Sequence, residues 1–171
     1  GIYQKLKTDG SGTSEKVYIY VGMRRGGRVL YAFDVTDPTT PKYLWRKTNT
    51  DLSKLGQTWS EPRVARIKGN TNPVLIFGGG YDATAEDAVS AGTTTMGNRV
   101  YVLDAFTGTL LKEFSAMSRS VVADVTLIDS DADGYIDRAY AVDLGGLVWR
   151  MDFETGAGET TADKWSIFEL A

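Results

Sequence analysis

GNRVYVLDAFTGTLLKEF, residues 97–114, is the segment that decides the fold. It opens with a glycine-led turn and continues as a run of β-branched and aromatic residues that ends at Asp104. Thr107 and Gly108 then make a turn, and a second β-type run follows. Runs bounded by Gly, Asn and Asp in this way are typical of strands joined by tight turns. The segment therefore predicts two adjacent antiparallel strands.

Two further segments repeat this unit. They are GGRVLYAFDVTDPTTPKYLWRK, residues 26–47, and GGLVWRMDFETGAGETTADKWSIFEL, residues 145–170. A strand that runs into glycines precedes every copy, and the two later copies have one more strand before it. Four strands per repeat is the spacing of a β-propeller blade. The repeat predicts an incomplete blade at about residues 16–47 and fuller blades at about residues 59–114 and 120–170.

The rest of the chain indicates an all-β, antiparallel fold. Apart from a short, weak helical candidate at residues 83–90, no stretch shows the 3.6-residue period of a helix. About two and a half four-stranded blades cannot close a ring, because propellers need roughly four to eight. We therefore expect the chain to pair with the remainder of a larger propeller or with another chain, since free strand edges are adhesive. The polar residues 81–98 predict an exposed, mobile insertion loop.

Composition excludes several classes of function. The 171 residues include no cysteine and no histidine, which excludes disulfides, thiolate zinc sites and histidine bases. The net charge of -3 argues against general nucleic-acid binding, since no basic excess is available to neutralise phosphates. No apolar run is long enough for a membrane span. The remaining chemistry relies on the oxygen atoms of carboxylates, hydroxyls and carbonyls.

One turn concentrates negative charge. IDSDADGYID, residues 128–137, places aspartates at positions 1, 3, 5 and 9 of a Ca²⁺-binding loop, with glycine at position 6 where the backbone must turn sharply. Position 7 of such a loop contributes its backbone carbonyl. Ca²⁺ suits this set of oxygens better than Mg²⁺, because it accepts irregular geometry. The predicted ligands are the side chains of Asp129, Asp131, Asp133 and Asp137 and the carbonyl oxygen of Tyr135.

This loop departs from an EF-hand in two ways. Position 12 is Tyr140 instead of a bidentate glutamate, and the flanking segments predict strands instead of helices. The missing ligand should weaken binding, to a Kd on the order of 10⁻⁶ to 10⁻³ M. The alternative is a solvated acidic turn that binds nothing. Because a full D-x-D-x-D-G-x-x-D match is much rarer by chance than two aspartates near a glycine, the sequence favours Ca²⁺.

The loop belongs to a longer motif. Within residues 121–154 it is followed by R-x-Y-x-x-D-L-G-G-x-x-W-R-x-D, and GQTWSEPRVARI and LIFGGGYD lie upstream at residues 56–67 and 75–82. Together these segments resemble the β-propeller of the PilY1/PilC family, the tip-associated type IV pilus biogenesis factors. The resemblance covers about residues 17–152 and is strongest in the last third of the chain.

The resemblance implies a seven-bladed, modified propeller in an exported Gram-negative protein, located at the cell surface or pilus tip, in the outer membrane or in the periplasm. It implies a non-enzymatic module whose aspartate loop binds Ca²⁺, with occupancy regulating pilus extension against retraction, twitching motility and surface attachment. The implied partners are type IV pilus subunits such as minor pilins, or a host or abiotic surface. The family's Arg-Gly-Asp host-receptor motif has no match here, so integrin binding through that motif is not expected.

Two other functions stay open at this point. DAFTGTLLKEF, residues 104–114, resembles blades of PQQ-type quinoprotein dehydrogenases, which also use Ca²⁺ but need a closed propeller with a central cofactor pocket. Integrin-α-like ligand-binding propellers also carry D-x-D-x-D-G-x-x-D loops. They usually repeat the loop in several blades, whereas this sequence contains it in one segment.

Other prominent residues favour structural roles. FGGG, residues 77–80, lacks the Lys-Ser/Thr of a phosphate-binding loop and predicts glycines where blades approach closely. The strand-ending aspartates are expected to cap backbone N–H groups. Asp124 and Asp143 lie near the aspartate loop in the sequence and could support its ligands. Four tryptophans are expected in the core between blades: Trp45, Trp59, Trp149 and Trp165.

Overall fold

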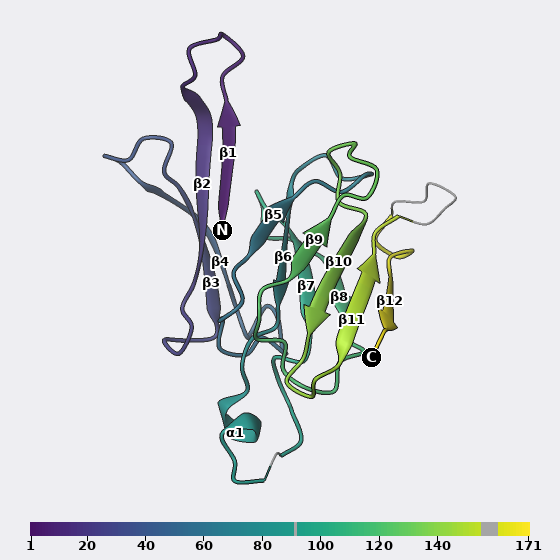
Figure 1. Cartoon of the computed structure of the whole chain (residues 1–171). Helices are drawn as coiled ribbons and strands as arrows, with labels where there is room; N and C mark the ends of the chain where they lie inside the picture. Colours follow the sequence, from purple (N-terminus) through teal and green to yellow (C-terminus); the bar gives the residue numbers. More distant parts are fainter. Residues whose placement is uncertain (91, 155–160) are drawn as a thin grey trace.

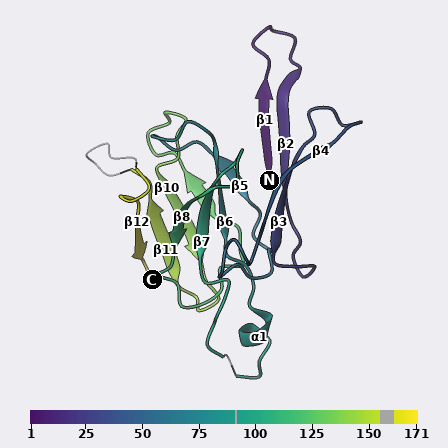
Figure 2. The ribbon, with the colours of Figure 1, turned by 180° about the vertical axis from the view of Figure 1, so that it is seen from behind.

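The computed structural model describes residues 1–90, 92–154 and 161–171. These residues form three four-stranded sheets in which consecutive strands are neighbours (Figure 1). The strand pairs are antiparallel, as the hairpin pattern of the sequence predicted. Figure 2 shows from behind that the second sheet lies between the other two. The all-β, antiparallel class is confirmed.

The first sheet corrects the expectation of an incomplete blade at about residues 16–47. Its first strand pairs with the second and supplies the strand that the sequence analysis missed. That strand has the sequence IYQKL, and only Tyr3 is partly covered, so it lacks the apolar alternation that marks a strand. The sheet consists of β1 (Ile2–Leu6), β2 (Ser14–Gly22), β3 (Val29–Asp34) and β4 (Lys42–Thr48).

The second and third sheets fall inside the ranges that the repeat predicted, residues 59–114 and 120–170. The second sheet contains β5 (Arg63–Ala65), β6 (Val74–Gly78), β7 (Val100–Asp104) and β8 (Leu110–Phe114). The third contains β9 (Thr126–Ile128), β10 (Arg138–Val142), β11 (Val148–Asp152) and β12 (Ser166–Glu169).

The second sheet is covered on both faces. Along β6, Val74 and Ile76 belong to the apolar core shared with the third sheet, whereas Leu75 and Phe77 belong to the core shared with the first. Because successive side chains of a strand point to opposite faces, β6 needs an unbroken apolar sequence to serve both cores. Fully burying one such side chain stabilises the fold by about 1.5–3 kcal/mol. The central sheet therefore holds the three sheets together.

Glycines permit the close approach of segments at the end of β6. Gly80 has a φ of +99°, and a Cβ there would stand 2.1 Å from the carbonyl oxygen of Gln57. A Cβ on Gly78 would stand 2.4 Å from the carbonyl oxygen of Val121. Real Cβ atoms do not come this close to backbone, so these positions require glycine. The structural role predicted for the FGGG segment is confirmed.

The segment between β6 and β7 was expected to be an exposed, mobile insertion loop at residues 81–98; residues 87–90 are exposed, and the segment is anchored at its base. Its helix is α1 (Ala83–Glu86), shorter than the candidate at residues 83–90. Asp82 is fully buried, and its carboxylate accepts hydrogen bonds from the backbone N–H groups of Thr84, Ala85, Thr95 and Met96. The side chain of Glu86 forms an ion pair with Arg119. The hydrogen bonds of Asp82 join the two ends of the segment to each other, and the ion pair joins the segment to the β8–β9 connection.

The other structural expectations are met in part. Trp45, Trp149 and Trp165 are buried, whereas Trp59 is partly exposed beneath the guanidinium of Arg24. Asp34 and Asp104 accept hydrogen bonds from backbone N–H groups just after their strands, as predicted. Asp152 instead pairs with the side chains of Arg138 and Arg150. Across the described ranges, no helix is long and apolar enough to cross a membrane.

Candidate metal centre

The aspartate loop joins β9 to β10 at one end of the third sheet (Figure 1). Its two ends are fixed by the sheet, since Ile128 pairs with Arg138 and the N–H of Asp137 donates to the carbonyl oxygen of Ile128 at 3.0 Å. The nine residues between these strands, 129–137, therefore close as a hairpin loop, as the sequence predicted from its β-type flanks.

Three of the four predicted carboxylates converge. Asp129, Asp131 and Asp137 each offer a carboxylate oxygen within 4.8 Å of the others. Oxygens around one Ca²⁺ ion lie about 2.3–2.6 Å from it, so a common ligand shell allows oxygen separations of up to about 5 Å. Asp137 is buried, Asp129 is half-buried and Asp131 is exposed, so the cluster opens toward solvent on one side. The residues present fit a hard divalent cation.

The backbone of the loop gives two of these aspartates a defined position. The N–H of Gly134 donates to Asp129 at 2.8 Å, and Gly134 has a φ of +88°, which glycine adopts without strain. Ser130 donates its N–H to Asp137 at 2.6 Å and its hydroxyl to the same oxygen. Ala132 also has a positive φ, of 61°, which is uncommon for a residue with a Cβ. The turn thus directs the Asp129 and Asp137 carboxylates toward each other, and the positive φ of Ala132 is the backbone strain that accompanies this arrangement.

Asp133 does not join the other three carboxylates. Its Oδ2 lies 2.6 Å from the ammonium nitrogen of Lys68, and its Oδ1 accepts the N–H of Tyr135 at 2.9 Å. The hydrogen bond from Lys68 holds the pKa of the Asp133 carboxyl below its ordinary value. Lys68 also lies 2.8 Å from Glu154 and 3.9 Å from Asp131. The hydrogen bonds that Lys68 donates to Asp133 and then to Glu154 raise the pKa of Lys68 in turn.

Sequence reasoning missed Lys68 and Glu154. Lys68 belongs to the β5–β6 connection of the second sheet, and Glu154 follows β11 of the third. A single lysine in a hairpin carries no local signal for pairing with a loop far along the chain. The approach of the two sheets brings these charges together.

The second sheet also supports the loop through Arg66. The N–H of Ile136 donates to the backbone carbonyl of Arg66 at 2.7 Å. The Arg66 guanidinium lies 5.0 Å from the ring centroid of Tyr135, and its Nη2 donates to the phenol oxygen at 3.3 Å. The Tyr135 side chain therefore contacts the neighbouring sheet. Coordination of a cation by the Tyr135 carbonyl stays a prediction.

Asp124 and Asp143 have other partners than the aspartate loop. Asp124 accepts the N–H of Glu61 at 2.6 Å and lies 3.6 Å from Arg63. Asp143 follows β10 at the end remote from the loop and accepts the indole N–H of Trp149 at 3.0 Å. Proximity in the sequence was misleading here, because one strand separates Asp143 from the loop.

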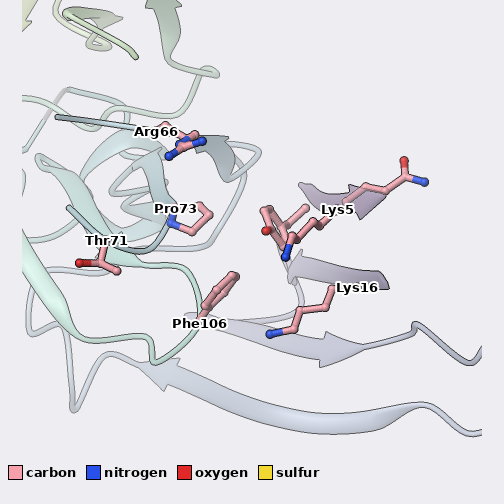
Figure 3. A pocket seen from close by; sticks show the side chains of 8 residues that line it. Lys5, Lys16, Arg66, Thr71, Pro73 and Phe106 are labelled. Carbon is pink, nitrogen blue, oxygen red and sulfur yellow. The ribbon is translucent and has the colours of Figure 1, made fainter. Parts of the chain in front are cut away.

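A pocket of different character lies between the first two sheets (Figure 3). It has a volume of about 410 Å³ and combines cationic side chains with aromatic rings. The Lys16 ammonium lies 5.3 Å from the ring centroid of Phe106. Its positive lining makes the pocket unsuitable for a cation and distinguishes it from the aspartate loop. The lining residues are Tyr3, Gln4, Lys5, Lys16, Arg66, Thr71, Pro73 and Phe106.

Comparison with known families gives a match to the family described as "PilY1 beta-propeller domain" over residues 3–166. The relatives include a type IV pilus biogenesis factor PilY1 homolog of Xylella fastidiosa, 34% identical over 159 residues, which cover 87% of this chain and 12% of that protein. The type IV pilus biogenesis factor PilY1 of Pseudomonas aeruginosa strain UCBPP-PA14 is 36% identical over 131 residues, covering 74% of this chain and 10% of that protein.

The fold is similar to a solved structure. The crystal structure of the Pseudomonas aeruginosa PilY1 C-terminal domain superimposes with a TM-score of 0.72 at 23% sequence identity. The match covers 98% of this chain and 35% of that chain. The chain thus spans about a tenth of the length of its sequence relatives and about a third of that structure. Both comparisons agree with the resemblance that the motifs indicated.

Proposed function

Because the chain belongs to the PilY1 β-propeller family of type IV pilus biogenesis factors, we propose that its aspartate loop binds Ca²⁺ and that occupancy of the loop regulates the pilus. The family is non-enzymatic, which favours this proposal over the quinoprotein dehydrogenase. The observation that carries the proposal is the convergence of Asp129, Asp131 and Asp137 within 4.8 Å.

Charge explains why the loop would respond to a cation. Two like charges about 4 Å apart repel by roughly 4 kcal/mol near a protein surface, and less where water screens them. A bound divalent ion supplies the opposite charge and so orders the loop. The residues that would hold it are Asp129, Asp131 and Asp137, joined by Asp133 and the Tyr135 carbonyl if the loop adjusts.

Ordering of the loop would also affect the two sheets that it contacts. Its two ends are residues of the β9–β10 hairpin, and Ile136 is hydrogen-bonded to Arg66 of the second sheet. A conformational change in the loop would therefore alter both the third sheet and its contact with the second sheet. We infer that Ca²⁺ binding in this way stabilises one conformation of the propeller surface that contacts the partner.

In the parent protein this module would act outside the cytoplasm, at the cell surface or the pilus tip. The partners that fit are minor pilins during pilus assembly, or a host or abiotic surface during attachment. Extension against retraction, and hence twitching motility, would then depend on external Ca²⁺. The remaining blades would come from the rest of the parent protein, since this chain matches 35% of the related solved structure.

Isothermal titration calorimetry on the EGTA-stripped chain tests the proposal. We expect saturable Ca²⁺ binding at one site per chain, with a Kd on the order of 10⁻⁶ to 10⁻³ M, and a rise in melting temperature. Mg²⁺ titrated under the same conditions is the control and should bind more weakly. Absence of both binding heat and a thermal shift at millimolar Ca²⁺ would exclude the metal site.

A further inference from the structure

Lys68 reaches from the second sheet into the charged loop of the third. Its ammonium nitrogen lies 2.6 Å from Asp133 and 2.8 Å from Glu154, and its side chain is one-third exposed, at 32%. The side chains of Asp133 and Glu154 are 30% and 19% exposed. The three groups thus form a partly covered clamp between two sheets.

Asp133, which takes part in this clamp, is the one predicted carboxylate ligand that lies apart from the other three. Asp129, Asp131 and Asp137 converge, while the two oxygens of Asp133 are engaged by Lys68 and by the N–H of Tyr135. Asp133 occupies position 5 of the loop motif, where a Ca²⁺ loop uses a ligand. A carboxylate oxygen 2.6 Å from an ammonium nitrogen binds a metal ion less favourably, because the two cations repel each other.

Resting on the proposed Ca²⁺ site, we propose that Lys68 is an internal cation that competes with Ca²⁺ for Asp133 and so sets the affinity of the loop from the neighbouring sheet. Without the ion, Lys68 neutralises Asp133 and joins the second sheet to the loop. When the ion binds, Asp133 turns to the cluster and the Lys68–Asp133 contact opens.

Glu154 makes this exchange possible. When Asp133 turns away, the ammonium group of Lys68 remains paired with the carboxylate of Glu154, 2.8 Å away. An unpaired charge in this partly covered position is therefore avoided. Lys68 also lies 3.9 Å from Asp131, a member of the cluster, so its charge opposes the incoming ion at a second carboxylate. Binding and clamping are thus linked reciprocally: whatever strengthens one weakens the other.

The test compares Ca²⁺ affinities of variants by calorimetry. Lys68→Met keeps the length of the side chain and removes its charge, and should lower the Kd for Ca²⁺ about threefold to tenfold, which corresponds to about 0.7–1.4 kcal/mol. Lys68→Arg keeps the charge and should bind more like the wild type. The matched control is Lys5→Met, since Lys5 forms an exposed ion pair with Glu15 at 2.8 Å, away from the loop.

A second readout follows the clamp itself. In EGTA, Lys68→Met should lower the melting temperature relative to the wild type, because the contact between sheets is lost. In saturating Ca²⁺ that difference should shrink, because the wild type has also released Asp133. Lys5→Met should show the same small difference in both conditions.

The outcomes separate the two proposals. If the wild type and Lys68→Met bind Ca²⁺ with the same Kd, the competition is refuted while the metal site stands. If Lys5→Met tightens binding as much as Lys68→Met, general charge accounts for the effect and the competition is again refuted. If neither the wild type nor Lys68→Met binds Ca²⁺, the metal site itself is absent and both proposals fail.

Discussion

Asp137 is the residue on which the candidate site depends most. It is 7% exposed, and one of its oxygens already accepts the N–H of Ser130. A buried carboxylate is pre-positioned and loses little freedom on binding an ion, whereas the exposed Asp131 must be ordered at a cost. The predicted ligands of this loop are therefore unequal in burial, although the sequence shows them as equivalent aspartates.

We expect Asp137→Asn to weaken Ca²⁺ binding at least about tenfold. The substitution preserves shape and an acceptor oxygen for Ser130 but removes one negative charge from the cluster. Asp9→Asn, in the β1–β2 connection, is the control and should leave the affinity unchanged. Calorimetry in the same buffer measures both; equal Kd values for Asp137→Asn and the wild type would mean that Asp137 is not a ligand.

Gly80 supports a second prediction at this scale. Gly80→Ala should lower the free energy of unfolding by about 3 kcal/mol or more, because the new Cβ would stand 2.1 Å from a backbone oxygen and the φ of +99° is strained for alanine. Gly10→Ala, where φ is +75° and no atom lies within 4 Å, isolates the backbone strain and should cost about 1 kcal/mol. Urea denaturation measures both; equal losses would refute the role of close approach.

At the scale of elements, the connection between β6 and β7 is held by a buried carboxylate. Burial alone would raise the pKa of Asp82, but hydrogen bonds from the N–H groups of Thr95, Ala85 and Met96 outweigh it and lower the pKa below 3.8. A carboxyl whose pKa is lower in the folded state stabilises the fold above its unfolded pKa. That stabilisation is lost as the pH falls through the lowered value.

We therefore predict that Asp82→Asn lowers the melting temperature at pH 7, corresponding to roughly 2 kcal/mol of lost hydrogen bonding. The difference from the wild type should begin to shrink below about pH 3.8, where the carboxyl of the unfolded state becomes protonated, and should be lost as the pH falls through the lowered pKa of the folded state. Thermal melts from pH 7 to pH 2 on both proteins measure this. A difference that stays constant across that range would contradict the assignment.

At the scale of the whole molecule, one face of the third sheet exposes apolar side chains among the described residues. On the third sheet, Val142 pairs with Val148, and Val142 and Phe168 are 48% and 44% exposed. In β6, by contrast, all five residues are buried because sheets cover both sides. Exposed apolar faces of this kind are typical of surfaces that contact another part of a protein. The face fits coverage by a further blade of the parent propeller.

The isolated chain should consequently self-associate through this face at high concentration. Val142→Lys is expected to reduce that association without lowering the melting temperature, since Val142 contributes little to the core. Ser53→Lys adds the same charge at an exposed position outside the sheets and is the control. Analytical ultracentrifugation over a range of concentrations measures the effect; an equal reduction by both variants would indicate net charge instead of the apolar face.

Most of the fold was predictable because its signals are local. Strand and turn composition within each repeat identified the later sheets, and the spacing of residues 128–137 identified the loop. The strand β1 was missed because IYQKL is largely exposed and shows no apolar alternation. Its assignment depends on pairing with β2, a tertiary contact.

The sequence by itself determined the repeated strand-and-turn unit and the spacing of the four aspartates in one loop, since both depend on neighbours along the chain. Only the tertiary structure decided which carboxylates converge and what neutralises the remaining one. Lys68 meets Asp133 and Glu154 because two sheets pack together. The charge around the loop is therefore a property of the junction between sheets: electrostatic partners are selected by distance in space, which spacing along the chain does not encode.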